Sequence, residues 1–252
     1  PEKRGIATGI VNAGGSFGQF TLLPLAQLFI GLAGWQPAMV IMGVLGLAAI
    51  PAILWITQSA IAHPADNLVR TAAAGTLGQA LSQAVRDPSF LLLTAGFFTC
   101  GFHVAFIATH LPGVVASCGR PRAVSAWSLA LIGLFNIFGS LWIGKAITGR
   151  RMKVALAWLY FARAAMIVAF FFAPKTALTF LVFACGIGFT YLSTVPPTIG
   201  LVVKFYGVRY MATLFGVVML SHQVGGFLGA WLGGRAFESS GSYDWMWWAD
   251  AA

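Results

Sequence analysis

The chain has 252 residues, of which 59% are hydrophobic and only 8% are charged, and its formal net charge is +9. A soluble domain carries about 25% charged residues, so this composition excludes a soluble globular protein and indicates an integral, multi-pass protein of the lipid bilayer. The positive charge does not indicate nucleic-acid binding, because the Lys and Arg residues lie in short breaks between apolar stretches.

Seven apolar stretches are long enough to cross a membrane, since about 20 apolar residues span a hydrocarbon core about 30 Å thick. They are residues 5–32, 36–57, 89–111, 124–146, 152–173, 176–203 and 208–235. Each is expected to be helical, because a single lipid-spanning segment must satisfy its own backbone hydrogen bonds. The predicted fold class is therefore all-α, a polytopic membrane helix bundle.

Basic residues divide unequally between the two ends of these helices. Ten lie on one side: Lys3, Arg4, Arg70, Arg86, Lys145, Arg150, Arg151, Lys153, Lys204 and Arg209. Four lie on the other: Arg120, Arg122, Lys175 and Arg235. Because Lys and Arg are enriched in cytoplasmic loops, the first side is predicted to be cytoplasmic.

The longest polar break, residues 58–88, separates two predicted helices from five. Its later part, Thr76–Val85, has apolar side chains at helical spacing: Leu77, Ala80, Leu81 and Ala84. This pattern is compatible with a short amphipathic helix along the cytoplasmic face.

Both ends of the sequence indicate a piece of a longer chain. It begins with PEKRG rather than Met, and the aromatic side chains of its final YDWMWWADAA resemble the belt that opens a further helix: Tyr243, Trp245, Trp247 and Trp248. We therefore expect further spans before and after this segment; the alternative is a mature protein of seven helices.

Two segments resemble a known transporter family. KRGIATGIVNAGGSFGQFTLLPLAQLFIGLAGWQPAMVIMG resembles the fifth and sixth helices of a major facilitator superfamily transporter, in the branch of monocarboxylate transporters and oxalate/formate-type antiporters. The matching residues are Lys3, Arg4, Gly5, Ala7, Gly9, Ala13, Gly14, Gly18, Pro24, Gly34 and Trp35. FGVVMLSHQVGGFLGAWLGG resembles the eleventh helix of bacterial members.

The resemblance implies an incomplete major facilitator-like bundle. Residues 1–57 would be the last two helices of the N-terminal half, 58–88 the central cytoplasmic loop, and 89–252 five helices and the start of a sixth from the C-terminal half. The acidic residue that the family carries after its eighth helix is absent, because Gly144 is followed by Lys145, Ala146, Ile147 and Thr148 before Gly149 and two arginines. The resemblance therefore implies no charge-paired cytoplasmic latch in this half.

Glycines recur four residues apart in two of the predicted helices. Gly14 and Gly18 lie in the first, and Gly225, Gly229 and Gly233 form a stripe in the last. Without Cβ atoms such a face lets a neighbouring backbone approach closely, so we predict helix packing there. A further interpretation is that flat faces allow two halves to move past each other, as alternating access requires.

Polar side chains at membrane depth are costly and usually face a cavity or a partner. The candidates for substrate binding or coupling are His103, Asn136, Arg163, Tyr191, Thr194, His222 and Gln223. Tyr191 and Thr194 precede Pro196 and Pro197, and a proline pair frees backbone carbonyls and kinks a helix.

Each candidate also has a structural interpretation. Arg163 attracts an anion or holds a neighbouring helix through its carbonyls. His222 contacts substrate or proton or bonds to another helix, and Asn136 is more typical of packing than of ligand binding. His103 and His110 lie seven residues apart on one helical face, so they are placed to line an outward path.

The favoured function is a secondary transporter of a small solute in a bacterial inner membrane; a transporter-like sensor or scaffold and a membrane-embedded enzyme are the alternatives. A basic interior without carboxylates favours a small organic anion, such as a monocarboxylate. We expect no catalytic group, metal or cofactor, since the sequence has no phosphate loop or metal-ligand motif and its three cysteines form no ligand-spaced cluster. No Asp or Glu lies inside a predicted span, so proton coupling would use either a carboxylate from helices outside this sequence or a histidine, whose ordinary pKa is near 6.5.

Overall fold

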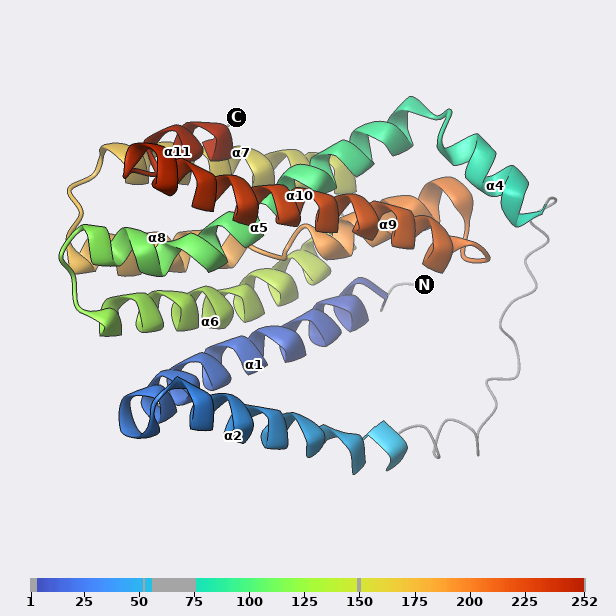
Figure 1. The fold of residues 1–252 in the computed structure, drawn as a ribbon. Coiled ribbons are helices and arrows are strands. Elements are labelled where there is room, and N and C mark those ends of the chain that lie inside the picture. The colour runs from blue at the N-terminus through green and yellow to red at the C-terminus, as the bar shows by residue number, and fades with distance from the viewer. Residues whose placement is uncertain (1–3, 52, 56–75, 149–150, 252) are drawn as a thin grey trace.

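The computed structural model describes residues 4–51, 53–55, 76–148 and 151–251, and this part of the chain is helical with no strand. Seven of its helical stretches are long and apolar enough to cross a membrane, which confirms the predicted number. They are Gly9–Ala33, Trp35–Trp55, Pro88–Ser117, Arg122–Ala146, Met152–Phe172, Ala177–Tyr206 and Met211–Ser240. The helices lie roughly side by side in an elongated bundle (Figure 1).

The first two helices form a hairpin at one edge of the bundle (Figure 1). Helix α1 (Arg4–Ala33) turns at Gly34 into α2 (Trp35–Leu47). Gly34 has a positive φ of 85°, which a residue without Cβ adopts at no steric cost, so the Gly-Trp pair marks the turn. Helix α1 packs along α6 (Arg122–Ala146), which joins the hairpin to the rest of the described chain.

The predicted amphipathic helix is present as α4 (Leu77–Ala84). Thr76 begins it with a capping box, in which its hydroxyl accepts from the backbone N–H of Gln79 and the Gln79 side chain accepts from the Thr76 N–H. The preceding part of the 58–88 segment, up to residue 75, lies outside the described residues.

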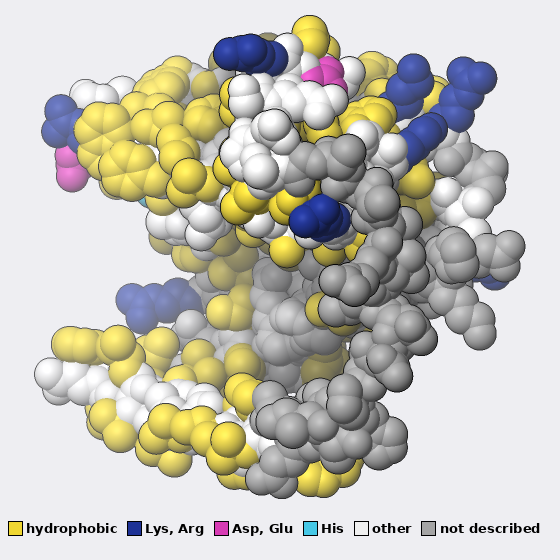
Figure 2. Space-filling model, turned by 90° about the vertical axis from the view of Figure 1, so that its right-hand side faces the viewer, with side chains coloured by type: hydrophobic (Ala, Val, Ile, Leu, Met, Phe, Trp, Pro, Cys, Tyr) yellow, Lys and Arg dark blue, Asp and Glu magenta, His cyan; other side chains and the backbone are white. Residues whose placement is uncertain are grey.

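Helix α4 lies at the end of the bundle predicted to be cytoplasmic. Just beyond it, Asp87 caps α5 (Pro88–Ser117) and accepts a hydrogen bond of 2.6 Å from the Tyr206 hydroxyl. Ser89, Lys153 and Lys204 line one cavity, so α4 shares its end of the bundle with these basic residues. Figure 2 looks onto this end, where several Lys and Arg side chains gather.

The sixth span was expected as one kinked helix over 176–203, but it is two helices. Helix α8 (Ala177–Thr190) ends before the proline pair, and α9 (Val195–Tyr206) begins just ahead of it. Pro196 and Pro197 have no N–H to donate to the carbonyls four residues earlier, so the helical hydrogen-bond ladder cannot pass through this point. The break, Tyr191–Thr194, lies inside the bundle and exposes backbone polar groups that need other partners.

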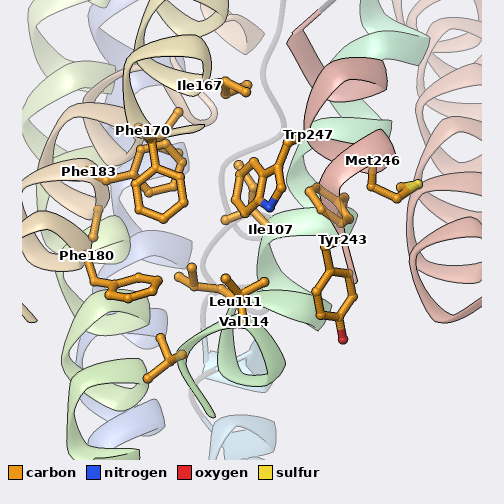
Figure 3. Packing of buried hydrophobic residues seen from close by; sticks show 14 of the residues in the cluster. Ile107, Leu111, Val114, Ile167, Phe170, Phe180, Phe183, Tyr243, Met246 and Trp247 are labelled. Atoms are coloured by element: carbon orange, nitrogen blue, oxygen red, sulfur yellow. The ribbon is translucent and has the colours of Figure 1, made fainter. Parts of the chain in front are cut away.

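The last two helices are α10 (Met211–Ser240) and α11 (Asp244–Ala251), joined at Gly241, whose φ is 69°. Trp247 of α11 packs between Phe170 of α7 (Met152–Phe172) and Phe106 of α5, in the largest apolar cluster (Figure 3). The interpretation of the C-terminal aromatics as a belt is therefore wrong for Tyr243 and Trp247, which are buried in the core; Trp245 and Trp248 are exposed.

Candidate functional site

Arg163 of α7 binds the backbone of the helix break. Its guanidinium donates to the carbonyl of Thr190 and, at 2.7 Å, to that of Tyr191, and it points a third N–H at the Cys100 sulfur, 3.4 Å away. Only 1% of Arg163 is exposed. Of the two roles weighed for Arg163, the geometry matches the holding of a neighbouring helix through its carbonyls.

Cys100 of α5 lies beside this guanidinium and joins two further candidates to it. Its sulfur is 3.3 Å from the Thr194 hydroxyl and interacts with the His222 imidazole of α10. His222 is buried, and its ring lies 5.1 Å from that of Phe97. The break thus brings Arg163, Thr194 and His222 into one cluster around the Cys100 thiol, which no sequence pattern indicated.

Asn136 of α6 holds the opposite side of the break. Its carbonyl oxygen accepts from the Leu192 N–H at 2.9 Å, and its amide donates to the Ser16 hydroxyl of α1 at 2.6 Å. Asn12 of α1 donates to the Leu192 carbonyl at 3.3 Å and to Ser140 at 2.6 Å. Asn12 and Ser16, four residues apart on one helical face, are the sequence signal for this contact, and sequence reasoning missed it.

His103 has a partner that the sequence analysis did not foresee. Its Nδ1 lies 2.7 Å from Oδ1 of Asp250 on α11, and Asp250 is 0% exposed. The expectation of a basic interior without carboxylates is therefore wrong, although no Asp or Glu lies inside the seven predicted spans. Asp250 escaped attention because it lies in the last eight-residue helix, beyond the seven long apolar stretches.

Tyr191 lies between these groups. It is buried, and its hydroxyl donates to the Val104 carbonyl of α5 at 2.7 Å, one residue beyond His103. Gln223 is exposed, although its carbonyl oxygen is 3.2 Å from Nδ1 of His222. His110 lies nearer the end of α5, where its Nε2 contacts the Ala230 carbonyl at 2.8 Å.

The three glycines of α10 face α5 and are buried. A Cβ at Gly225 or Gly229 would meet the backbone of Phe98 or Phe102, and one at Gly233 would meet the His110 ring. The two helices run in the same direction and pack more extensively than any other described pair. Gly101 of α5 makes the reciprocal approach to the His222 carbonyl.

The glycines of α1 differ from those of α10. No atom of another helix among the described residues lies within 4 Å of a Cβ built at Gly14, and at Gly18 only Leu22 of the same helix does so. The predicted packing of these two glycines has no partner in the part of the chain that the structure describes. Within that part there is also no group of three His, Cys, Asp or Glu side chains placed to hold a metal ion.

Comparison with known proteins identifies a family for this chain. The family model of the Major Facilitator Superfamily matches residues 1–230, nearly the whole chain. The chain belongs to the Major Facilitator Superfamily.

Individual relatives within the superfamily match at low identity over most of this chain. Monocarboxylate transporter 13 of Rattus norvegicus is 23% identical over 247 residues, covering 96% of this chain and 55% of the relative. The uncharacterized MFS-type transporter YcxA of Bacillus subtilis is 24% identical over 95% of this chain and 59% of its own length. Monocarboxylate transporter 12 of Homo sapiens is 24% identical over 96% of this chain and 52% of its own length.

This superfamily member therefore spans little more than half the length of the curated relatives it matches. It is an integral, multi-pass membrane protein, and proteins of its family carry small-molecule substrates across membranes. Its monocarboxylate-transporter relatives support the branch that the resemblance indicated.

Proposed function

We propose that the protein is a secondary active transporter of a small organic anion of the monocarboxylate class, working by alternating access in a bacterial inner membrane. The observation that carries the proposal is the match along 96% of the chain to relatives named monocarboxylate transporters. Substrate, direction and membrane are proposals for this chain, since it covers 52–55% of those two relatives.

The proposed domain division follows the same family. Residues 1–57 belong to the N-terminal half, 58–88 form the central cytoplasmic loop, and 89–252 belong to the C-terminal half. On this division the α1–α6 contact is a contact between halves, and the bonds that Asn136 and Asn12 make across it tie the two halves at mid-membrane. Alternating access would require these bonds to break and re-form.

His222 is the proposed contact for substrate, with Gln223 beside it on the same helix. The imidazole lies next to the fixed positive charge of Arg163, and a neutral histidine offers one donor and one acceptor to a carboxylate. Arg163 supplies an attractive field rather than a direct contact, because both of its terminal nitrogens already donate to carbonyls or the Cys100 sulfur. Asn136, Tyr191 and Thr194 shape the site by holding the break.

Uptake of labelled pyruvate tests the proposal. The protein, expressed from its complete gene and reconstituted in vesicles, is expected to take up [¹⁴C]pyruvate with saturation, and His222→Gln is expected to raise KM. Gly216→Ala serves as the matched control, since nothing lies within 4 Å of a Cβ there on the same helix. Uptake of a labelled sugar but not of pyruvate would overturn the substrate class; no solute flux at all would favour a sensor, scaffold or enzyme.

A further inference from the structure

His103 and Asp250 form a buried acid–base pair that is built into the fold. Helix α11 and the residue before it pack antiparallel to α5 in successive layers, in which the Tyr243 ring is tilted against His110, Trp247 meets Phe106 edge-on, and Asp250 meets His103. These layers repeat every three to four residues on both helices, as side chains on one helical face do. The carboxylate is therefore positioned by aromatic packing and not by a loose chain end.

The pair has room for one more proton. One proton lies in the 2.7 Å contact between His103 Nδ1 and Asp250 Oδ1. Within the described residues, Asp250 Oδ2 is buried and has no hydrogen-bond partner, and His103 bonds through Nδ1. A carboxylate oxygen buried without a donor is expensive, so binding a proton at the pair relieves a cost that a purely structural contact would not carry.

The charged groups around the pair determine how one added proton changes the net charge of the cluster. Arg163 and Tyr191 interact electrostatically with Asp250. The other titratable or charged groups on α5, α7, α10 and α11 are Cys100 and His110, Lys153 and Tyr160, His222, Arg235 and Glu238, and Asp244, and Tyr243 comes just before α11. With His103 neutral, the charges of Arg163 and Asp250 cancel, and one added proton leaves the cluster with a net charge of +1.

We infer that His103 and Asp250 together bind the coupling proton of this transporter, in addition to the proton that the pair already shares. Before the coupling proton binds, the pair carries a charge of −1. After it binds, the pair is neutral, either as imidazolium with carboxylate or as imidazole with carboxylic acid. The added proton makes the surroundings of His222 more positive, which favours entry of an anion and makes proton and anion travel together. The coupling to an anion rests on the proposed function, whereas proton binding at the pair does not.

Proton binding is tested without any substrate. The purified full-length protein in lipid nanodiscs is stepped from about pH 8 to about pH 5, a range that brackets the ordinary histidine pKa near 6.5. Proton uptake is measured with a pH electrode, and infrared difference spectra record the carboxyl C=O and imidazolium bands. Asp250→Asn and His103→Gln are compared with Asp244→Asn, which changes an exposed acid of the same helix.

Wild type and Asp244→Asn are expected to take up one more proton per molecule than Asp250→Asn or His103→Gln. The carboxyl C=O or imidazolium band that accompanies this proton is expected in the first two proteins and absent from the last two. Equal uptake and unchanged bands in all four proteins would overturn the inference. If Asp250→Asn alone elutes as an aggregate, His103→Gln decides, because this variant keeps the Asp250 charge that balances Arg163.

Transport assays distinguish proton coupling from substrate transport itself. Asp250→Asn is expected to lose pyruvate accumulation driven by a proton gradient at least tenfold, while retaining exchange of internal for external pyruvate. Gradient-driven accumulation that persists in this variant would overturn the coupling role. If wild type takes up the proton but carries no pyruvate, the proposed substrate class fails and the proton site stands.

Discussion

Gly229→Ala tests how closely α5 and α10 approach. The added Cβ would lie 3.1 Å from both the Cα and the carbonyl carbon of Phe102, and closer still to its oxygen. Because these are backbone atoms, a side chain cannot rotate away and the helices themselves must separate. Overpacking of this kind costs about 1–3 kcal/mol, whereas replacing Gly by Ala within a helix contributes about 1 kcal/mol in favour of folding.

Gly216→Ala cancels the second effect. It makes the same substitution in α10 at a site where nothing lies within 4 Å of the new Cβ. The difference in free energy of unfolding between the two variants should therefore report the clash alone, about 1–3 kcal/mol. We expect SDS titration in mixed micelles to show Gly229→Ala as the less stable variant by that amount, and Gly229→Leu to impair folding or transport more severely. Equal stabilities for the two alanine variants would refute the close approach.

Three further predictions concern polar contacts. Arg163→Lys keeps the charge but loses the planar fork, so the free energy of unfolding in the same titration should fall by about 1–3 kcal/mol with little change in pyruvate KM; a raised KM at unchanged stability would contradict this. Asn136→Ala leaves the Leu192 N–H without its acceptor, so the free energy of unfolding should fall by about 1–3 kcal/mol. An unchanged free energy of unfolding would show that this bond is dispensable. The hydrogen bond from Tyr206, followed by that from the backbone N–H after the cap, lowers the pKa of Asp87. The resulting stabilisation is present above the ordinary aspartate pKa near 4 and is lost as the pH falls through the lower folded value. The protection factor for hydrogen exchange in the first turn of α5 should fall at about pH 3, and Asp87→Asn should show the lower protection factor already at pH 6.

The membrane-spanning helices were predictable because their signals are local. Apolar length gives the number of spans, Gly34 marks a turn through its conformational freedom, and the Thr76 capping box marks the start of α4. Pro196 and Pro197 predicted a disturbance of the sixth span, although a sequence alone does not say whether the helix bends or stops. It stops here because Arg163 and Asn136 supply partners for the freed backbone groups, and these residues come from distant helices.

The buried polar site was only partly predictable. Membrane depth selected His103, Arg163 and His222, since an ionisable group is costly anywhere in a span. Depth says nothing of partners, however, so the Asp250 contact and the grouping around Cys100 depended on how α11 and α5 pack in three dimensions. Cys100 also resembles an ordinary small apolar residue in an apolar helix, and no pattern in the sequence distinguishes it.

The break between α8 and α9 is held rigid, like a fixed elbow. A proline-interrupted helix with free backbone groups is commonly a place where a chain bends during function, but here the freed groups are bound from both sides. Arg163 holds two carbonyls on the α7 side, and Asn136 holds an N–H on the α6 side. Bending at this elbow would break charge-assisted bonds away from water, so α6, α7, α8 and α9 should travel as one rigid body. Asn136 also donates a hydrogen bond to Ser16 of α1. The same residue therefore holds the helix break rigid and must lose its bond to Ser16 before α1 can move along α6.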